Sequence, residues 1–122
     1  MSDVDELVTR YLAAWNETDE AHRATALRAL WVEDGGYTDP LVDVRGHDAI
    51  SAVIAGVHAQ FPGYVFQLEK AGEEHHGRVR FSWGLAASAG AESVVVGTDV
   101  AVLAPDGRMR EVHGFLDRVP AA

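Results

Sequence analysis

The first half of the chain carries apolar side chains every three to four residues, which is the period of an amphipathic helix. Three segments show this period: residues 3–17, 20–33 and 46–61. The apolar stripe of the first segment contains Tyr11, and that of the third contains His58. A polar group on a core-facing stripe needs a partner or a cavity, so the sequence leaves both residues open as core or as site residues.

After residue 63 the period shortens to about two, which predicts strands. Four segments show it: residues 64–69, 78–87, 93–104 and 108–118. Short turns join the last three, so we expect an antiparallel meander. A further short strand over 37–39 ends before Pro40, because the residue before a proline favours extended backbone. The pattern predicts an α+β fold, with three N-terminal helices packed on one face of a curved, mainly antiparallel sheet.

Residues 94–103 are apolar on both faces, which is typical of a central strand that is covered on two sides. Asp99 is the one ionisable residue of this segment. It is either satisfied by hydrogen bonds near a bend at Gly97 or held neutral in an apolar cavity, where it can donate a hydrogen bond. The opposite face carries Val94, Val96, Val100 and Val102. We expect a second copy of the chain to cover that face, giving a homodimer.

Other polar positions have two interpretations each. Asp39 is held before Pro40 on extended backbone, either as a structural turn residue or as a carboxylate at the mouth of a pocket. The face on which His113 lies is ambiguous from the pattern. His75 and His76 are neighbours at a strand end and point opposite ways, so they do not form a metal site. We expect no metal and no cofactor.

Composition narrows the classes of function. The chain has 122 residues, enough for one domain with a core, and we expect a single domain over residues 1–122. The absence of cysteine excludes thiol nucleophiles and thiolate metal sites. The formal net charge of -9 argues against nucleic acid and membrane partners. Neither a signal peptide nor a membrane-spanning run is evident, so the expected location is the cytoplasm.

Four stretches carry a family resemblance: TRYLAAWNETD, YTDP, RGHDAI and TDVAVLAPDGRMREVHGF. With them the chain resembles the nuclear-transport-factor-2-like (NTF2-like) superfamily, whose fold is a cone of helices on a curved sheet. It is most similar to the SnoaL-like and ketosteroid-isomerase-like proteins. The superfamily includes isomerases, cyclases, hydrolases, dehydratases and proteins without known chemistry, so the fold alone does not name a reaction.

The resemblance to ketosteroid isomerases implies catalytic roles for three residues. Their general base is an aspartate before a proline, which matches Asp39. Their oxyanion-stabilising tyrosine lies in the first helix and matches Tyr11, and their neutral aspartic acid matches Asp99, eight residues before Gly107. These matches imply a cofactor-independent isomerase or cyclase that removes a proton next to the carbonyl of a small apolar ligand.

The remaining expected site residues would contact the substrate: Tyr37, His58, Trp83, Val95 and Leu116. The segment VHAQFPG resembles SnoaL-like relatives more than steroid isomerases. An epoxide-hydrolase-like relay would need Arg78 or Arg80 beside Asp99, and no pattern places either there. The alternative function is a non-catalytic domain that binds a small hydrophobic ligand.

Overall fold

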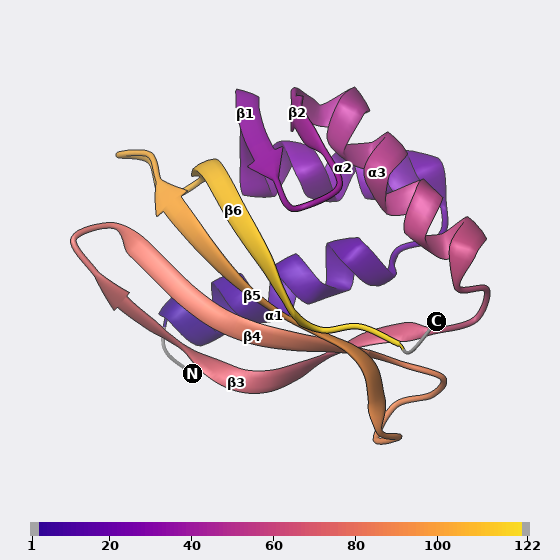
Figure 1. The fold of residues 1–122 in the computed structure, drawn as a ribbon. Helices are drawn as coiled ribbons and strands as arrows, with labels where there is room; N and C mark the ends of the chain where they lie inside the picture. The colour runs from indigo at the N-terminus through magenta and orange to yellow at the C-terminus, as the bar shows by residue number, and fades with distance from the viewer. Residues whose placement is uncertain (1–2, 121–122) are drawn as a thin grey trace.

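A computed structural model describes residues 3–120, and within them three helices cover the concave face of a curved six-stranded sheet (Figure 1). The helices are α1 (Asp3–Asn16), α2 (Glu20–Leu30) and α3 (His47–Gln60). The strands are β1 (Trp31–Thr38), β2 (Asp43–Arg45), β3 (Val65–His75), β4 (Arg78–Ala86), β5 (Ser93–Leu103) and β6 (Met109–Arg118). Their order in the sheet is β2-β1-β6-β5-β4-β3.

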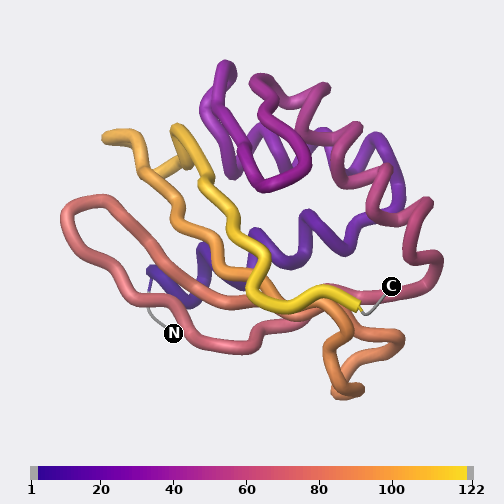
Figure 2. The backbone as a smooth tube through the Cα atoms, viewed as in Figure 1, coloured from indigo at the N-terminus to yellow at the C-terminus, as the bar shows by residue number. Residues whose placement is uncertain are grey.

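The meander expected in the second half of the chain is confirmed. Strands β3, β4, β5 and β6 pair in sequence order, each antiparallel to the next, as the backbone trace in Figure 2 shows. β1 joins the free edge of β6 in parallel orientation, and β2 pairs antiparallel with β1 at the edge of the sheet. The α+β class is therefore confirmed.

The detail of three N-terminal helices is not confirmed, whereas the early strand expected before the third helix is present as part of β1. Two helices precede the first strands, and the β1–β2 hairpin comes before α3. The second helix ends at Leu30, three residues before its expected end at 33, and the chain continues as β1. Trp31 pairs with Met109 of β6 and its side chain is fully buried, so sheet pairing overrides the helical period at this point.

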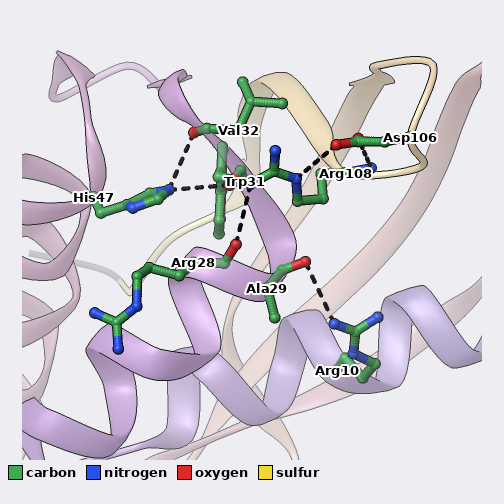
Figure 3. Close-up of polar contacts among 8 residues, drawn as sticks. All are labelled: Arg10, Arg28, Ala29, Trp31, Val32, His47, Asp106 and Arg108. Carbon is green, nitrogen blue, oxygen red and sulfur yellow. Dashed lines mark hydrogen bonds and ion pairs between the residues drawn. The ribbon is translucent and has the colours of Figure 1, made fainter.

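The C-terminal end of α2 is held by side chains from other parts of the fold (Figure 3). Carbonyls in the last turn of a helix lack partners within it and carry partial negative charge, so donors and cations there are stabilising. Arg10 of α1 donates to Ala29 O at 3.5 Å. Arg108 donates to the carbonyls of Arg28 and Trp31, at 3.4 Å each, and His47 donates to those of Trp31 and Val32, at 3.0 and 3.1 Å.

The two faces of β5 differ as expected. Its odd-numbered residues from Val95 to Ala101 are buried under the helices, and its even-numbered valines lie half-buried on the outer face. Helix α1 lies on the concave face, where its end is tied to β3 because the Asn16 side chain bonds both the N–H and the carbonyl of Phe66, at 2.7 and 2.9 Å. This tie fixes the direction in which α1 presents its buried stripe to the sheet.

Gly97 leaves room for a tryptophan on the neighbouring strand. Trp83 of β4 pairs with Gly97 of β5, and a Cβ atom on Gly97 would lie 2.3 Å from Trp83 Cζ2. Real Cβ contacts are not this short, so the indole lies over β5 because residue 97 has no side chain.

We predict that Gly97→Ala lowers the free energy of unfolding by about 1–3 kcal/mol, the usual cost of overpacking a core. The matched control is Gly56→Ala in α3, where a Cβ meets nothing within 4 Å. That change should raise stability by about 0.5–1 kcal/mol, because alanine is the better helix former. Urea denaturation of both variants checks this, and an unchanged or increased stability of Gly97→Ala would contradict the packing.

Candidate active site

A cavity of about 220 Å³ lies between the helices and the concave face of the sheet. Its wall is mostly aromatic and aliphatic, and includes Trp15, Phe61, Phe66, Trp83, Val95 and Leu116. Its polar lining residues are Tyr11, Tyr37, Asp39, Gln60 and Asp99. Within the described part of the chain, no lysine, arginine or histidine lines it. The cavity therefore combines apolar walls with two phenols and two carboxyl groups.

Tyr11 and Asp99 meet at the buried end of the cavity. The Tyr11 hydroxyl donates to Asp99 Oδ2 at 2.6 Å, and each residue is 2 % exposed. Trp83 Nε1 donates to Asp99 Oδ1 at 3.0 Å. Gly114 of β6 pairs with Asp99, and a Cβ there would lie 2.9 Å from Oδ1, so this glycine also makes room for the carboxyl group. The polar residue of the α1 stripe and the polar residue of β5 are thus partners.

Burial controls the ionisation of this pair. Loss of hydration raises the pKa of Asp99 to about 6, against the lowering effect of the hydrogen bonds from Tyr11 and Trp83, with a smaller rise from the charges of Asp39 and Asp117. Burial, followed by the charge of Asp99, raises the pKa of Tyr11 well above 10.0. Tyr11 therefore stays a phenol, while Asp99 changes its charge in a range where many enzymes work.

Asp39 stands at a different point of the same cavity and is half-buried. Its Oδ1 accepts from the backbone N–H groups of Leu41 and Val42 at 2.8 and 3.0 Å, and its Oδ2 accepts from the Tyr37 hydroxyl at 2.7 Å. Burial, then the charges of Asp99 and Asp39, raises the pKa of Tyr37, which stays protonated and donates. Asp39 is thus a turn residue and a cavity residue at once.

Gly114 lies next to both Asp99 and Asp39. A Cβ at this position would lie 2.9 Å from Asp99 Oδ1 and 3.4 Å from Asp39 Cβ. The three residues that the family resemblance singles out, Tyr11, Asp39 and Asp99, therefore line one cavity around a glycine.

Four of the five expected substrate-contact residues line the cavity: Tyr37, Trp83, Val95 and Leu116. His58 does not. Its Nε2 lies 2.7 Å from the carbonyl of Trp15, to which it donates, so the ring ties α3 to α1. Helix α3 reaches the cavity through Val57, Gln60 and Phe61 instead.

The remaining polar candidates lie away from the cavity. His113 donates to Glu111 at 3.2 Å, and it pairs with Val100, one of the outer-face residues of β5. Arg80 forms an exposed ion pair with Glu73, and Arg78 donates to the carbonyl of His76, so neither arginine stands beside Asp99. The relay that an epoxide hydrolase would need is therefore not assembled.

Sequence reasoning missed the Trp83–Asp99 hydrogen bond, although it named both residues. Trp83 pairs with Gly97, two residues before Asp99, so finding the contact requires the register between β4 and β5. Alternation alone places the two residues on one face and does not place them in contact.

No three His, Asp or Glu side chains among residues 3–120 converge where they could hold a metal ion. Over the same residues, every helix is too short or too polar to cross a bilayer.

We predict that Asp99→Asn stabilises the protein more as the pH rises. The pKa of Asp99 is about 6 in the folded protein and about 3.9 in an unfolded chain, so the folded state binds more protons between these values. Wild-type stability from this group is present below pH 4 and lost as the pH passes 6. The advantage of Asp99→Asn should therefore grow by about 2 kcal/mol from pH 4 to pH 8 in urea titrations. A pH-independent difference would contradict the burial of an ionisable group here.

Comparison with known proteins agrees with this architecture. The family model described as the SnoaL-like domain matches residues 8–112. The crystal structure of a candidate isomerase of the SnoaL-like family from Agrobacterium tumefaciens is 39 % identical, with a TM-score of 0.88 over 96 % of this chain and 99 % of that chain. No curated protein matches the sequence significantly.

Two more distant structures share the fold. A candidate SnoaL-like polyketide cyclase from Jannaschia sp. is 19 % identical, with a TM-score of 0.68 over 96 % of this chain and 90 % of that one. A SnoaL-like protein of unknown function from Burkholderia thailandensis is 16 % identical, with a TM-score of 0.72 over 93 % and 92 %. Since the SnoaL-like model covers most of the sequence, the chain belongs to the SnoaL-like family of the NTF2-like superfamily.

Proposed function

We propose that the protein is a small-molecule isomerase or cyclase that removes a proton next to a carbonyl group in its apolar cavity. The observation that supports this most is that the Tyr11–Asp99 pair and Asp39 line one cavity and that both aspartates lie next to Gly114. The names of the Agrobacterium and Jannaschia proteins, a candidate isomerase and a candidate polyketide cyclase, agree with this class of reaction.

Asp39 is the general base in this proposal. A carboxylate offers about four acceptor positions, and three of those on Asp39 are occupied, which fixes its orientation and leaves one for a substrate C–H. The carboxylate takes the proton from the carbon next to the carbonyl, and the electron pair of that C–H bond moves into an enolate. In an isomerisation the proton returns to a different carbon; in an aldol-type cyclisation the enolate carbon attacks a second carbonyl and the alkoxide takes the proton.

The enolate oxygen is stabilised by the Tyr11 hydroxyl. When Asp99 is ionised, the single hydroxyl proton of Tyr11 lies on the hydrogen bond to Oδ2. When Asp99 is protonated, its own proton occupies that hydrogen bond, and the Tyr11 O–H is free to donate into the cavity. A preorganised donor in a dry site contributes on the order of 3 kcal/mol to catalysis. The active form of the site therefore carries a proton on Asp99.

We predict that Asp39→Asn lowers turnover of a β,γ-unsaturated ketone by about 100-fold or more, because the general base is lost. The assay follows cyclohex-3-enone as it becomes the conjugated enone, by ultraviolet absorption. Asp43→Asn in β2 is the matched control, since Asp43 is exposed and does not line the cavity, and its turnover should equal that of the wild type. Full activity of Asp39→Asn, or an inactive wild type across a ketone panel, would count against the proposal.

A non-catalytic domain that binds a small hydrophobic ligand is the second candidate. It is favoured by one observation: both carboxyl groups already have protein donors, two for Asp99 and three for Asp39. Ligand binding without turnover in the wild type would select this function.

We further propose that the outer sheet face pairs with a second copy of the chain. Val94, Val96, Val100 and Val102 lie half-buried on it, and Phe115, paired with Thr98, is 59 % exposed beside them. Light scattering should give twice the mass of one chain, and Val100→Glu should give the mass of one. Thr25→Glu, at an exposed position of α2, should leave the dimer intact. A monomeric wild type would contradict this proposal.

A further inference from the structure

One buried side-chain polar atom in the described residues has no hydrogen-bond partner, and it belongs to a cavity residue. This atom is Nε1 of Trp15, a residue that is 5 % exposed. The other two indole N–H groups are satisfied: Trp31 donates to Gly36 O at 3.1 Å, and Trp83 donates to Asp99. A buried donor without an acceptor destabilises a protein, so its presence calls for an explanation.

Trp15 and Tyr11 are neighbours in the cavity wall, with their ring centroids 6.2 Å apart and their planes inclined by 40°. The Trp15 side chain lowers the pKa of Tyr11, against the larger effect of burial. No hydrogen bond of normal geometry joins them. Two neutral donors, one indole N–H and one phenol O–H, therefore lie side by side at the polar end of the cavity.

We propose that Trp15 and Tyr11 together bind one acceptor oxygen, and that the ligand is a neutral compound of one or two rings that carries this oxygen as a ketone. The inference rests on the proposed function, whose substrate class it narrows. It adds Trp15 as a ligand-binding residue. Trp15 and Tyr11 contact the ligand oxygen, whereas Asp99 affects binding through its hydrogen bond with Tyr11.

The charge of the lining excludes an anionic ligand. The lining holds two carboxyl groups, Asp39 and Asp99, and in the described residues no basic side chain. A ligand carboxylate would lose its hydration and face like charges without a counter-ion, which is strongly unfavourable. A neutral ketone needs only hydrogen-bond donors for its oxygen, and the cavity has two in Trp15 and Tyr11.

Size and the nature of the mouth limit the ligand further. The cavity volume of about 220 Å³ is below the roughly 300–1,000 Å³ of pockets that take drug-sized ligands. A compound of one or two rings fits this volume. Around the opening, Leu41 and Val119 are 80 and 56 % exposed and line the cavity, so any substituent that extends outward meets apolar surface.

Three ligands of equal shape test this inference: 2-acetylnaphthalene, 2-isopropenylnaphthalene, in which a methylene replaces the carbonyl oxygen, and 2-naphthoate. The protein is labelled with ¹⁵N in its three tryptophans, and the indole signals are followed by NMR at pH 5.5, where Asp99 is largely protonated. The ketone should move the Trp15 indole proton downfield, as a new hydrogen bond does. The alkene should bind without that shift, and naphthoate should bind at least tenfold more weakly than the ketone.

The variant Trp15→Phe keeps an aromatic ring and removes the N–H. It should weaken binding of the ketone about two- to tenfold, the worth of one neutral hydrogen bond, and leave binding of the alkene unchanged. Trp31→Phe is the matched control, because it makes the same change outside the cavity lining, and its ketone-to-alkene affinity ratio should equal that of the wild type.

Four results would overturn the inference: no binding of the ketone, no movement of the Trp15 signal on binding it, an unchanged affinity ratio in Trp15→Phe, or naphthoate binding as tightly as the ketone. The signal of the wild type decides the question even if a variant does not fold. Ketone binding with the Trp15 shift but without turnover would leave the inference standing and remove the catalytic function. Turnover of a ketone together with an unchanged ketone-to-alkene affinity ratio in Trp15→Phe would support the catalytic function and overturn the inference.

Discussion

The hydrogen bond between Tyr11 and Asp99 is the interaction on which the polar end of the cavity depends. A buried carboxyl group needs hydrogen-bond donors or a proton of its own. Asp99 accepts hydrogen bonds from the Tyr11 phenol and the Trp83 indole, and its raised pKa lets it hold a proton. The space for this group comes from two glycines, Gly97 under the indole of Trp83 and Gly114 opposite the carboxyl group. One buried acid thus explains the residue choices on β4, β5 and β6.

Two carboxyl groups in one cavity have different surroundings, and this difference allows different roles. Asp39 lies half-buried in a turn, where two backbone N–H groups and Tyr37 hold it in one orientation. Asp99 lies in the core, where loss of hydration favours its neutral form. When surroundings move the pKa values of two acids apart, one can act as a base while the other stays protonated and donates a hydrogen bond. In the proposed function, the Tyr11 O–H donates to Asp99 when Asp99 is ionised and into the cavity when Asp99 is protonated.

Periodicity was sufficient to predict the meander, the burial of alternate residues on β5 and the position of Tyr11 on the α1 stripe. It failed where tertiary pairing overrides it, as at Trp31, which continues a helical stripe but pairs in the sheet. It also failed at His58, because a stripe predicts burial and does not say whether the ring meets a cavity or the carbonyl of Trp15. The Trp83–Asp99 contact needs strand register, and the orphaned N–H of Trp15 needs coordinates, so neither was accessible from the sequence.

Asp99 is a buried acid whose ionisation is coupled to Tyr11. The most direct measurement is a titration of the side-chain carboxyl carbon of Asp99 by ¹³C NMR, in the wild type and in Tyr11→Phe. We expect a midpoint near pH 6 in the wild type and a higher midpoint in Tyr11→Phe, because the variant loses a donor that favours the charged form. A midpoint near 4 in the wild type, or no change on removal of the phenol, would contradict it.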